Sequence, residues 1–114
     1  MRPVLRDIEP AVPADLSSAK DMSSLLVRLV IGPEDTEGAD NFDLMVSTPD
    51  GMVLSVARDT YRWGRHTLIV DRIDLDLVAR AVEAILRRCE ANTWEEVAAK
   101  IGRFAAWEFE DYQV

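Results

Sequence analysis

The sequence predicts an α+β fold in which helices pack on one face of a mainly antiparallel sheet. Two patterns lead to this prediction. Segments in which apolar and polar residues alternate, as they do in strands, concentrate in the first half of the chain, and segments with apolar residues at helical spacing concentrate between residues 74 and 104. The expected order is three strands, a short helix, a strand, two helices and a final strand. A length of 114 residues favours one domain spanning residues 1–114.

The first half of the chain supplies most of the strands. Residues 3–9 are an expected short strand, and a polar, proline-containing stretch follows over residues 10–23, in which residues 15–22 can form a helical turn. Residues 24–32 are the clearest strand, because apolar side chains alternate along them. After an acidic loop, residues 41–48 alternate in the same way, so we expect these two strands to pair as an antiparallel hairpin.

The segment after this hairpin has two interpretations. Thr48 as an N-cap and Pro49 at the first helical position favour a short helix. That helix would carry on one face Met52, Val53, Val56 and Ala57. The alternative is a turn at residues 49–51 followed by a strand over residues 52–56. Residues 66–73 are then an expected central strand, because apolar residues occupy both of its faces.

Two helices follow, and each has an N-cap residue. Asp74 precedes a run with apolar residues at helical spacing. Thr93 precedes a second run, and Glu96 lies three residues later, as in a capping box. The apolar stripe of this last helix consists of Trp94, Val97, Ala98, Ile101 and Phe104.

Residues 105–112 alternate aromatic and polar side chains and are expected to form the last strand. Strand geometry would send Trp107 and Phe109 into the core. Glu108, Glu110 and Tyr112 would then lie on the opposite face and point to solvent. On this face they would be beside Arg28 and Asp43 of the neighbouring strands.

The charge balance restricts the class of partner. The chain has 21 acidic and 13 basic residues, which gives a formal net charge of −8. A nucleic-acid binder gains affinity from Lys and Arg that neutralise phosphates, so this balance argues against a nucleic-acid partner. The N-terminus lacks the apolar segment of a signal peptide, and no apolar run reaches the roughly 20 residues of a membrane span. We therefore expect a cytoplasmic protein that binds no membrane.

Residues able to perform catalysis are scarce. The lone Cys89 lies on the apolar stripe of a helix and the lone His66 lies at a strand start, so neither has an evident catalytic partner. The acidic loop lacks the spacing of a calcium site, and Asp74 and Asp76 are explained by helix capping. None of the common nucleophile, phosphate-loop, dinucleotide or zinc-protease motifs occurs. The sequence predicts no enzyme, no cofactor and no metal.

Several short motifs together resemble the Immunity protein 8 family. The resemblance spans residue 25 to the end, and its most specific part is the tail. The motifs are Ile31-Gly32-Pro33, Asn41-Phe42-Asp43, Ser47-Thr48-Pro49, Gly64-Arg65-His66 with Leu68-Ile69-Val70, Thr93-Trp94-Glu95-Glu96-Val97, and Arg103-Phe104 with Trp107-Glu108-Phe109-Glu110-Asp111-Tyr112. Residues 49–62 depart from the family, which has a clearer helix where this chain has Gly51. The resemblance implies a small bacterial protein that neutralises the toxic domain of a polymorphic or contact-dependent toxin, with no catalytic motif.

If this resemblance holds, the partner is the toxic domain of a cognate effector, and the net charge suggests a basic domain such as a nuclease. Acidic residues and a tyrosine suit recognition of a basic protein. The first candidate contacts are Glu108, Glu110, Asp111 and Tyr112. The second are Glu34, Asp35, Glu37 and Asp40.

Two alternatives stay open. One is a small ligand-binding or enzymatic α+β domain centred on His66 and nearby arginines. The basic and aromatic cluster of Arg58, Arg62, Trp63 and Arg65 is of the kind that binds phosphates, although the overall charge favours a local counterweight to the acidic faces. The other alternative is an adaptor that self-associates through an open sheet face. The oligomeric state is not predicted.

Overall fold

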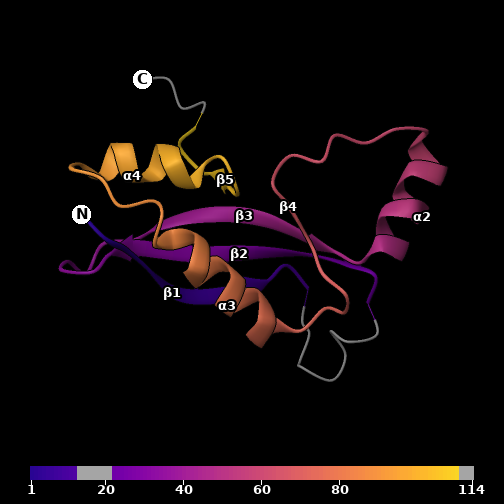
Figure 1. The fold of residues 1–114 in the computed structure, drawn as a ribbon, viewed down its shortest axis with the longest axis horizontal. Helices are drawn as coiled ribbons and strands as arrows, with labels where there is room; N and C mark the ends of the chain where they lie inside the picture. Colours follow the sequence, from indigo (N-terminus) through magenta and orange to yellow (C-terminus); the bar gives the residue numbers. More distant parts are fainter. Residues whose placement is uncertain (13–21, 111–114) are drawn as a thin grey trace.

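The computed structural model describes residues 1–12 and 22–110, and in these residues it confirms the α+β fold. Five strands form one sheet, and three helices accompany it within the described ranges (Figure 1). In chain order the elements are β1 (Pro3–Pro10), β2 (Ser24–Pro33), β3 (Asp40–Ser47), α2 (Pro49–Asp59), β4 (Thr67–Ile69), α3 (Leu75–Leu86), α4 (Trp94–Ile101) and β5 (Ala106–Trp107). The helical turn expected within residues 15–22 lies, except for its last residue, outside the described ranges.

The sheet is mainly antiparallel. β1 pairs with β2, and β2 pairs with β3 without interruption, from Ser24 opposite Ser47 to Ile31 opposite Asp40. The predicted hairpin is therefore confirmed. β4 pairs in parallel with the end of β3, whereas β5 pairs antiparallel with its beginning, so the two short strands divide one edge of β3.

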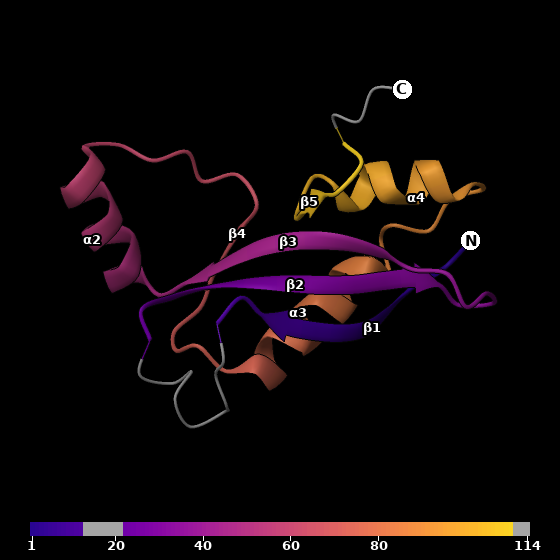
Figure 2. The same cartoon turned by 180° about the vertical axis from the view of Figure 1, so that it is seen from behind.

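The core lies between one face of the sheet and the helices α3 and α4. Alternate residues of β2 and β3 point to this face, among them Val27 and Phe42, whose side chains are fully buried. Val78 of α3 and Val97 of α4 are equally buried and belong to the same apolar cluster. Figure 2 shows the sheet from behind, with α3 on its far side. The opposite face of the sheet carries the exposed cross-strand ion pair of Arg28 and Asp43 at 3.2 Å.

All three helices begin at the predicted N-cap residues. In each case the capping side chain accepts a hydrogen bond from a backbone N–H two or three residues later, which satisfies a donor that the helix leaves free. The pairs are Thr48 with Gly51 at 3.1 Å, Asp74 with Asp76 at 3.0 Å, and Thr93 with Glu96 at 3.2 Å. The first of these caps decides between the two interpretations of the segment after β3 in favour of a helix.

Gly51 permits α2 to pack against the start of β2. A Cβ atom at this position would lie 2.2 Å from the carbonyl oxygen of Ser23 and 2.7 Å from the hydroxyl of Ser47. The same carbonyl accepts a hydrogen bond from the backbone N–H of Thr48 at 2.9 Å. The absence of a Cβ at Gly51 thus allows the first turn of the helix to lie against Ser23 and Ser47.

The predicted apolar face of α2 was wrong. Val53 and Val56 are exposed, while the buried residues are Gly51 and Ser55. The helix stands at one end of the sheet, away from α3 and α4 (Figure 1), so most of its apolar side chains do not reach the core. Helical periodicity identified the element but not the side that packs.

The strand predicted within residues 66–73 is present as β4, but its predicted length and central position were wrong. β4 covers only three of these residues and lies at the edge of the sheet. Val70 and Ile73 are nevertheless buried, because the irregular segment after β4 turns them into the core. Apolar residues on both faces therefore reflect packing of this segment and not a strand within the sheet.

The final strand is shorter than expected. β5 has two residues, and the chain then turns within residues 108–110. Trp107 is half-buried against the core, as predicted for its face, but Phe109 remains 43% exposed. The two rings meet edge to face with centroids 5.8 Å apart. Phe109 therefore covers Trp107 from outside instead of entering the core.

Candidate functional site

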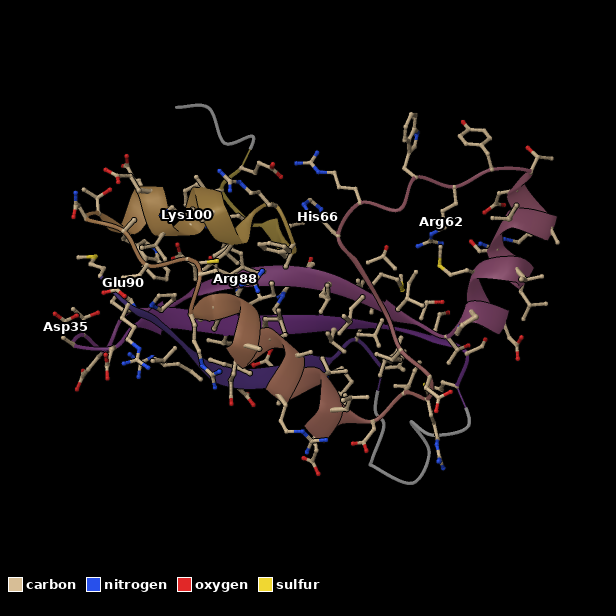
Figure 3. All side chains as sticks on the ribbon, viewed as in Figure 1. Asp35, Arg62, His66, Arg88, Glu90 and Lys100 are labelled. Atoms are coloured by element: carbon tan, nitrogen blue, oxygen red, sulfur yellow. The ribbon has the colours of Figure 1, made fainter. Side chains whose placement is uncertain are left out.

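The acidic loop, residues 34–40, forms the tip of the β2–β3 hairpin. Glu34, Asp35 and Glu37 are exposed there, and Figure 3 shows Asp35 at the end of the molecule opposite α2. Arg6 of β1 supports the loop, because its Nη2 donates a hydrogen bond to the carbonyl oxygen of Pro33 at 2.6 Å. Within the described ranges, Asp35 and Glu37 have no hydrogen-bond or ion-pair partner, so their charges face solvent.

The backbone of this loop is fixed by close contact. A Cβ atom on Gly32 would lie 2.0 Å from the carbonyl oxygen of Gly38. Arg6 also donates to the carbonyl of Thr36. The loop therefore folds back over the end of β2, and its carboxylates are presented by a defined structure.

Asp40, the last residue of the acidic loop, has a structural role that the sequence did not reveal. Its Oδ2 accepts one hydrogen bond from Nε1 of Trp94 at 2.8 Å and another from Nε1 of Trp107 at 3.0 Å. We call these three residues the indole clamp. It ties the start of α4 and β5 to the start of β3, and it leaves Asp40 half-buried.

The two described carboxylates of the tail are also engaged. Glu108 accepts a hydrogen bond from the backbone N–H of Asn41 at 3.0 Å and so extends the β3–β5 pairing. Glu110 forms an ion pair with Arg65 at 2.5 Å. Both residues are exposed, so contact with a partner is compatible with these bonds. Asp111 and Tyr112 lie outside the described residues.

An apolar pocket of about 210 Å³ lies between the sheet, α3 and the end of α4. His66 and Arg65 are at its rim, the arrangement that the ligand-binding alternative anticipates. However, Nε2 of His66 lies 2.7 Å from the carbonyl oxygen of Gly102, and Arg65 is paired with Glu110. Residues lining the pocket include Leu29, Leu44, Val82, Ile85 and Phe104. The pocket thus offers mainly apolar contact, and the side chains of His66 and Arg65 are already bonded to other groups.

The described residues offer little basis for catalysis or for metal binding. Cys89 is buried, and burial raises the pKa of its thiol, which disfavours the reactive thiolate. Its Sγ lies 3.4 Å from the carbonyl oxygen of Ile85. Within residues 1–12 and 22–110, no group of three or more His, Cys, Asp or Glu side chains is arranged to hold a metal ion.

The most exposed apolar surface belongs to a feature that we call the arm, residues 49–66. It consists of α2 and the segment that returns from α2 to β4, and it stands away from the helical layer (Figures 1 and 2). Its exposed large apolar residues are Val53, Leu54, Val56, Tyr61 and Trp63. Sequence reasoning considered Trp63 only as part of a basic cluster. The missed signal was a tyrosine and a tryptophan in a segment without a periodic apolar pattern.

The arginines of the arm are held by neighbouring side chains. Arg58 donates two hydrogen bonds to the carboxylate of Asp59, and this contact lowers the pKa of Asp59. Arg62 reaches back to the hydroxyl of Ser55 at 2.8 Å and so joins the return segment to α2 (Figure 3). These bonds orient the arm from within.

Comparison with known proteins identifies the family. The Immunity protein 8 family model matches residues 14–112. The chain belongs to the Immunity protein 8 family. No curated protein and no solved structure matches it.

The family match covers both the acidic loop and the arm, whereas β1 precedes it. Among the described residues of this Immunity protein 8 member, no helix is both long enough and apolar enough to cross a membrane.

Proposed function

We propose that this chain is an immunity protein that binds the toxic domain of a cognate bacterial effector and neutralises it by stoichiometric inhibition, without turnover. The observation that carries the proposal is its membership of the Immunity protein 8 family over residues 14–112. The protein acts as one folded domain in the cytoplasm. Because few free toxin molecules suffice to harm a cell, the complex must have a nanomolar Kd or better, about −12 kcal/mol of binding free energy.

The charge of the protein supports a basic partner. A net charge of −8 accelerates association with a cationic surface through electrostatic steering. A nuclease domain, which needs positive charge to bind phosphates, fits this description. The acidic loop is the best-placed steering element, because Asp35 and Glu37 are fully presented to solvent and Arg6 holds their backbone in place.

The tail carboxylates are the second contact that we propose. Glu108 and Glu110 are exposed while they bond to Asn41 and Arg65, and Asp111 and Tyr112 follow them in the sequence. Asp40 contributes by supporting the acidic loop through the indole clamp, and its own carboxylate is occupied.

The function is tested by co-expression with the toxic domain of the cognate effector. The expected result is protection of the cells and a 1:1 complex with a nanomolar Kd, measured by calorimetry. Cells that die at the usual rate while this protein is abundant and folded would rule out the proposal.

The steering role of the acidic loop is tested by exchanging Asp35 and Glu37 for lysine. The matched control exchanges Glu9 of β1 and Asp71, which are also exposed and lie away from the loop. Both variants change the net charge by the same amount, so a local role predicts a larger fall in the association rate for the loop variant, about 10-fold at low salt. Equal rates for the two variants would show that the loop has no special role.

The apolar pocket is the one observation that favours a second candidate function, the binding of a small apolar ligand. Its volume of about 210 Å³ suits a group of only a few carbon atoms. Ala81 lines the pocket, so Ala81→Phe would fill part of it. Two results together would rule out this candidate function. One is unchanged toxin neutralisation by the Ala81→Phe variant, and the other is an unchanged Tm of the wild type in the presence of small apolar acids.

A further inference from the structure

We propose that the arm, residues 49–66, anchors the toxin domain by inserting Tyr61 and Trp63 into an apolar patch on its surface. This inference rests on the proposed function and names the surface that carries it out. The acidic loop would bring the partners together, and the arm would hold them.

The first argument is exposure. Trp63 is 83% exposed and Tyr61 is 70% exposed, and on α2 Val53 and Leu54 are 66% and 63% exposed. A buried aromatic side chain covers about 150–250 Å². The two rings alone can therefore supply roughly 300 Å² of the about 800 Å² that each partner buries in a standard interface. Trp, Tyr and Arg are also the residues that dominate binding energy when an interface covers them.

The second argument is charge. Between residues 49 and 66 the chain has three arginines and two aspartates, and Arg58 pairs with Asp59 while Arg65 pairs with Glu110, so the arm is close to neutral on a protein of net charge −8. A matching partner surface is apolar where the rings insert and needs no excess of either charge around them. The acidic loop requires a basic surface instead, and so contacts a different patch of the partner.

The third argument is that the arm is already ordered for binding. Gly51 and the Ser23 carbonyl fix its base, and Arg62 joins the return segment to Ser55. At the far end, Arg65 pairs with Glu110. A backbone held in place before binding loses little conformational freedom when a partner covers the side chains that it carries.

The backbone of the return segment supports the same conclusion. Thr60 has φ 70° and His66 has φ 56°, so both ends of the segment that carries the two rings adopt the left-handed conformation. This conformation is unfavourable for residues other than glycine, above all for a β-branched threonine. Such strain collects at functional sites, where the surrounding contacts maintain it.

The acidic loop and the arm lie at opposite ends of a molecule 42 Å long (Figure 3). Long-range charge acts mainly on the association rate, and desolvated aromatic anchors act mainly on the dissociation rate. The two features therefore predict separable kinetic effects. Loop variants slow association, whereas arm variants speed dissociation.

The experiment uses the full chain and the toxic domain of the cognate effector, with kinetics measured by biolayer interferometry. Trp63→Ala and, separately, Tyr61→Ala are compared with Leu26→Ala, which removes an exposed apolar side chain from the open face of β2. The expected result is a rise in Kd of at least about 30-fold for each arm variant, through the dissociation rate, and less than about 3-fold for the control.

Fluorescence provides a second readout. Trp63 is the exposed indole, while Trp94 and Trp107 are half-buried in the clamp, so binding should shift the emission of Trp63 to shorter wavelength. Trp63→Phe should abolish this shift and retain more affinity than Trp63→Ala. Because Trp63 is so exposed, neither substitution should alter the urea midpoint of the free protein by more than a small amount.

The outcomes separate the two proposals. If the wild type fails to bind the toxin domain, the proposed function and this inference fall together. If the wild type binds but both arm variants bind equally well, the inference fails and the proposed function stands. A concentration-dependent mass that Trp63→Ala converts to a monomer would assign the arm to a second copy of this chain and would also overturn the inference.

Discussion

The Asp40→Ala substitution removes the acceptor of both indole hydrogen bonds, and we expect it to destabilise the protein by about 3 kcal/mol. A hydrogen bond to a charged group contributes about 1.5–3 kcal/mol when its partner stays behind without a replacement. All three residues of the clamp are half-buried, so water can partly replace the lost acceptor, and the lower end of this range applies. Two bonds at about 1.5 kcal/mol each give the expected value.

The assay is urea unfolding followed by circular dichroism, with a thermal scan beside it. For a domain of this size, about 3 kcal/mol corresponds to a decrease in Tm of roughly 12 °C. The matched control is Asp35→Ala in the same loop, which removes a solvent-facing carboxylate and should change stability by less than about 0.5 kcal/mol.

A double-mutant cycle isolates the hydrogen bonds from other effects. Trp94→Phe removes one donor and keeps a large ring, so it should cost at least about 1 kcal/mol in the wild type and much less in the Asp40→Ala background. Additive effects of the two substitutions, or a stability of Asp40→Ala equal to that of Asp35→Ala, would refute the idea that the clamp supports the fold.

Two further predictions concern Gly51 and Cys89. Gly51→Ala should destabilise the protein by about 2 kcal/mol in urea unfolding, because the added Cβ would lie 2.2 Å from the Ser23 carbonyl oxygen. The control is Gly64→Ala, which should be nearly neutral because a Cβ at this position would have no atom within 4 Å. Equal effects of the two substitutions would contradict the close packing at Gly51. Burial raises the pKa of the Cys89 thiol in the folded protein, so the folded state holds this proton more tightly than the unfolded state. The stability that results is present at neutral pH and is lost as the pH rises above 9.0, the ordinary pKa of the thiol. Unfolding midpoints measured from pH 7 to 10 should therefore fall less steeply at the alkaline end in Cys89→Ala than in the wild type, and identical slopes would show that the thiol does not contribute.

The sequence predicted those parts of the fold that depend on local chemistry. The β2–β3 hairpin followed from alternation along both strands, and the helix starts at Thr48, Asp74 and Thr93 followed from capping residues. These signals lie within a few residues of the structure that they produce, so one chain is enough to find them.

The errors arose where packing between distant segments decides the structure. The apolar residues at 66–73 suggested a central strand, but Val70 and Ile73 reach the core from irregular backbone. In α2, the absence of a side chain at Gly51, and not the apolar periodicity, determined which side faces inward. Such outcomes depend on which surfaces meet, which no local pattern contains.

The candidate site shows the same division. Acidic residues near 34–40 were evident from the sequence, and Asp35 and Glu37 do face solvent. The indole clamp was not evident, because Asp40 bonds to Trp94 and Trp107, which lie 54 and 67 positions further along the chain. The exposure of Tyr61 and Trp63 was missed because it depends on where the arm stands relative to the sheet.

The way in which the arm joins the sheet has a consequence for how such proteins diversify. It leaves from β3 and re-enters at β4, two neighbouring strands in which Met45 pairs with Thr67 and Ser47 pairs with Ile69. An excursion whose ends are side by side on a fixed framework can be lengthened, shortened or replaced without rearranging the interior. Under the proposal that the arm anchors the toxin domain, grafting this excursion from one relative onto another should transfer a preference for one toxin.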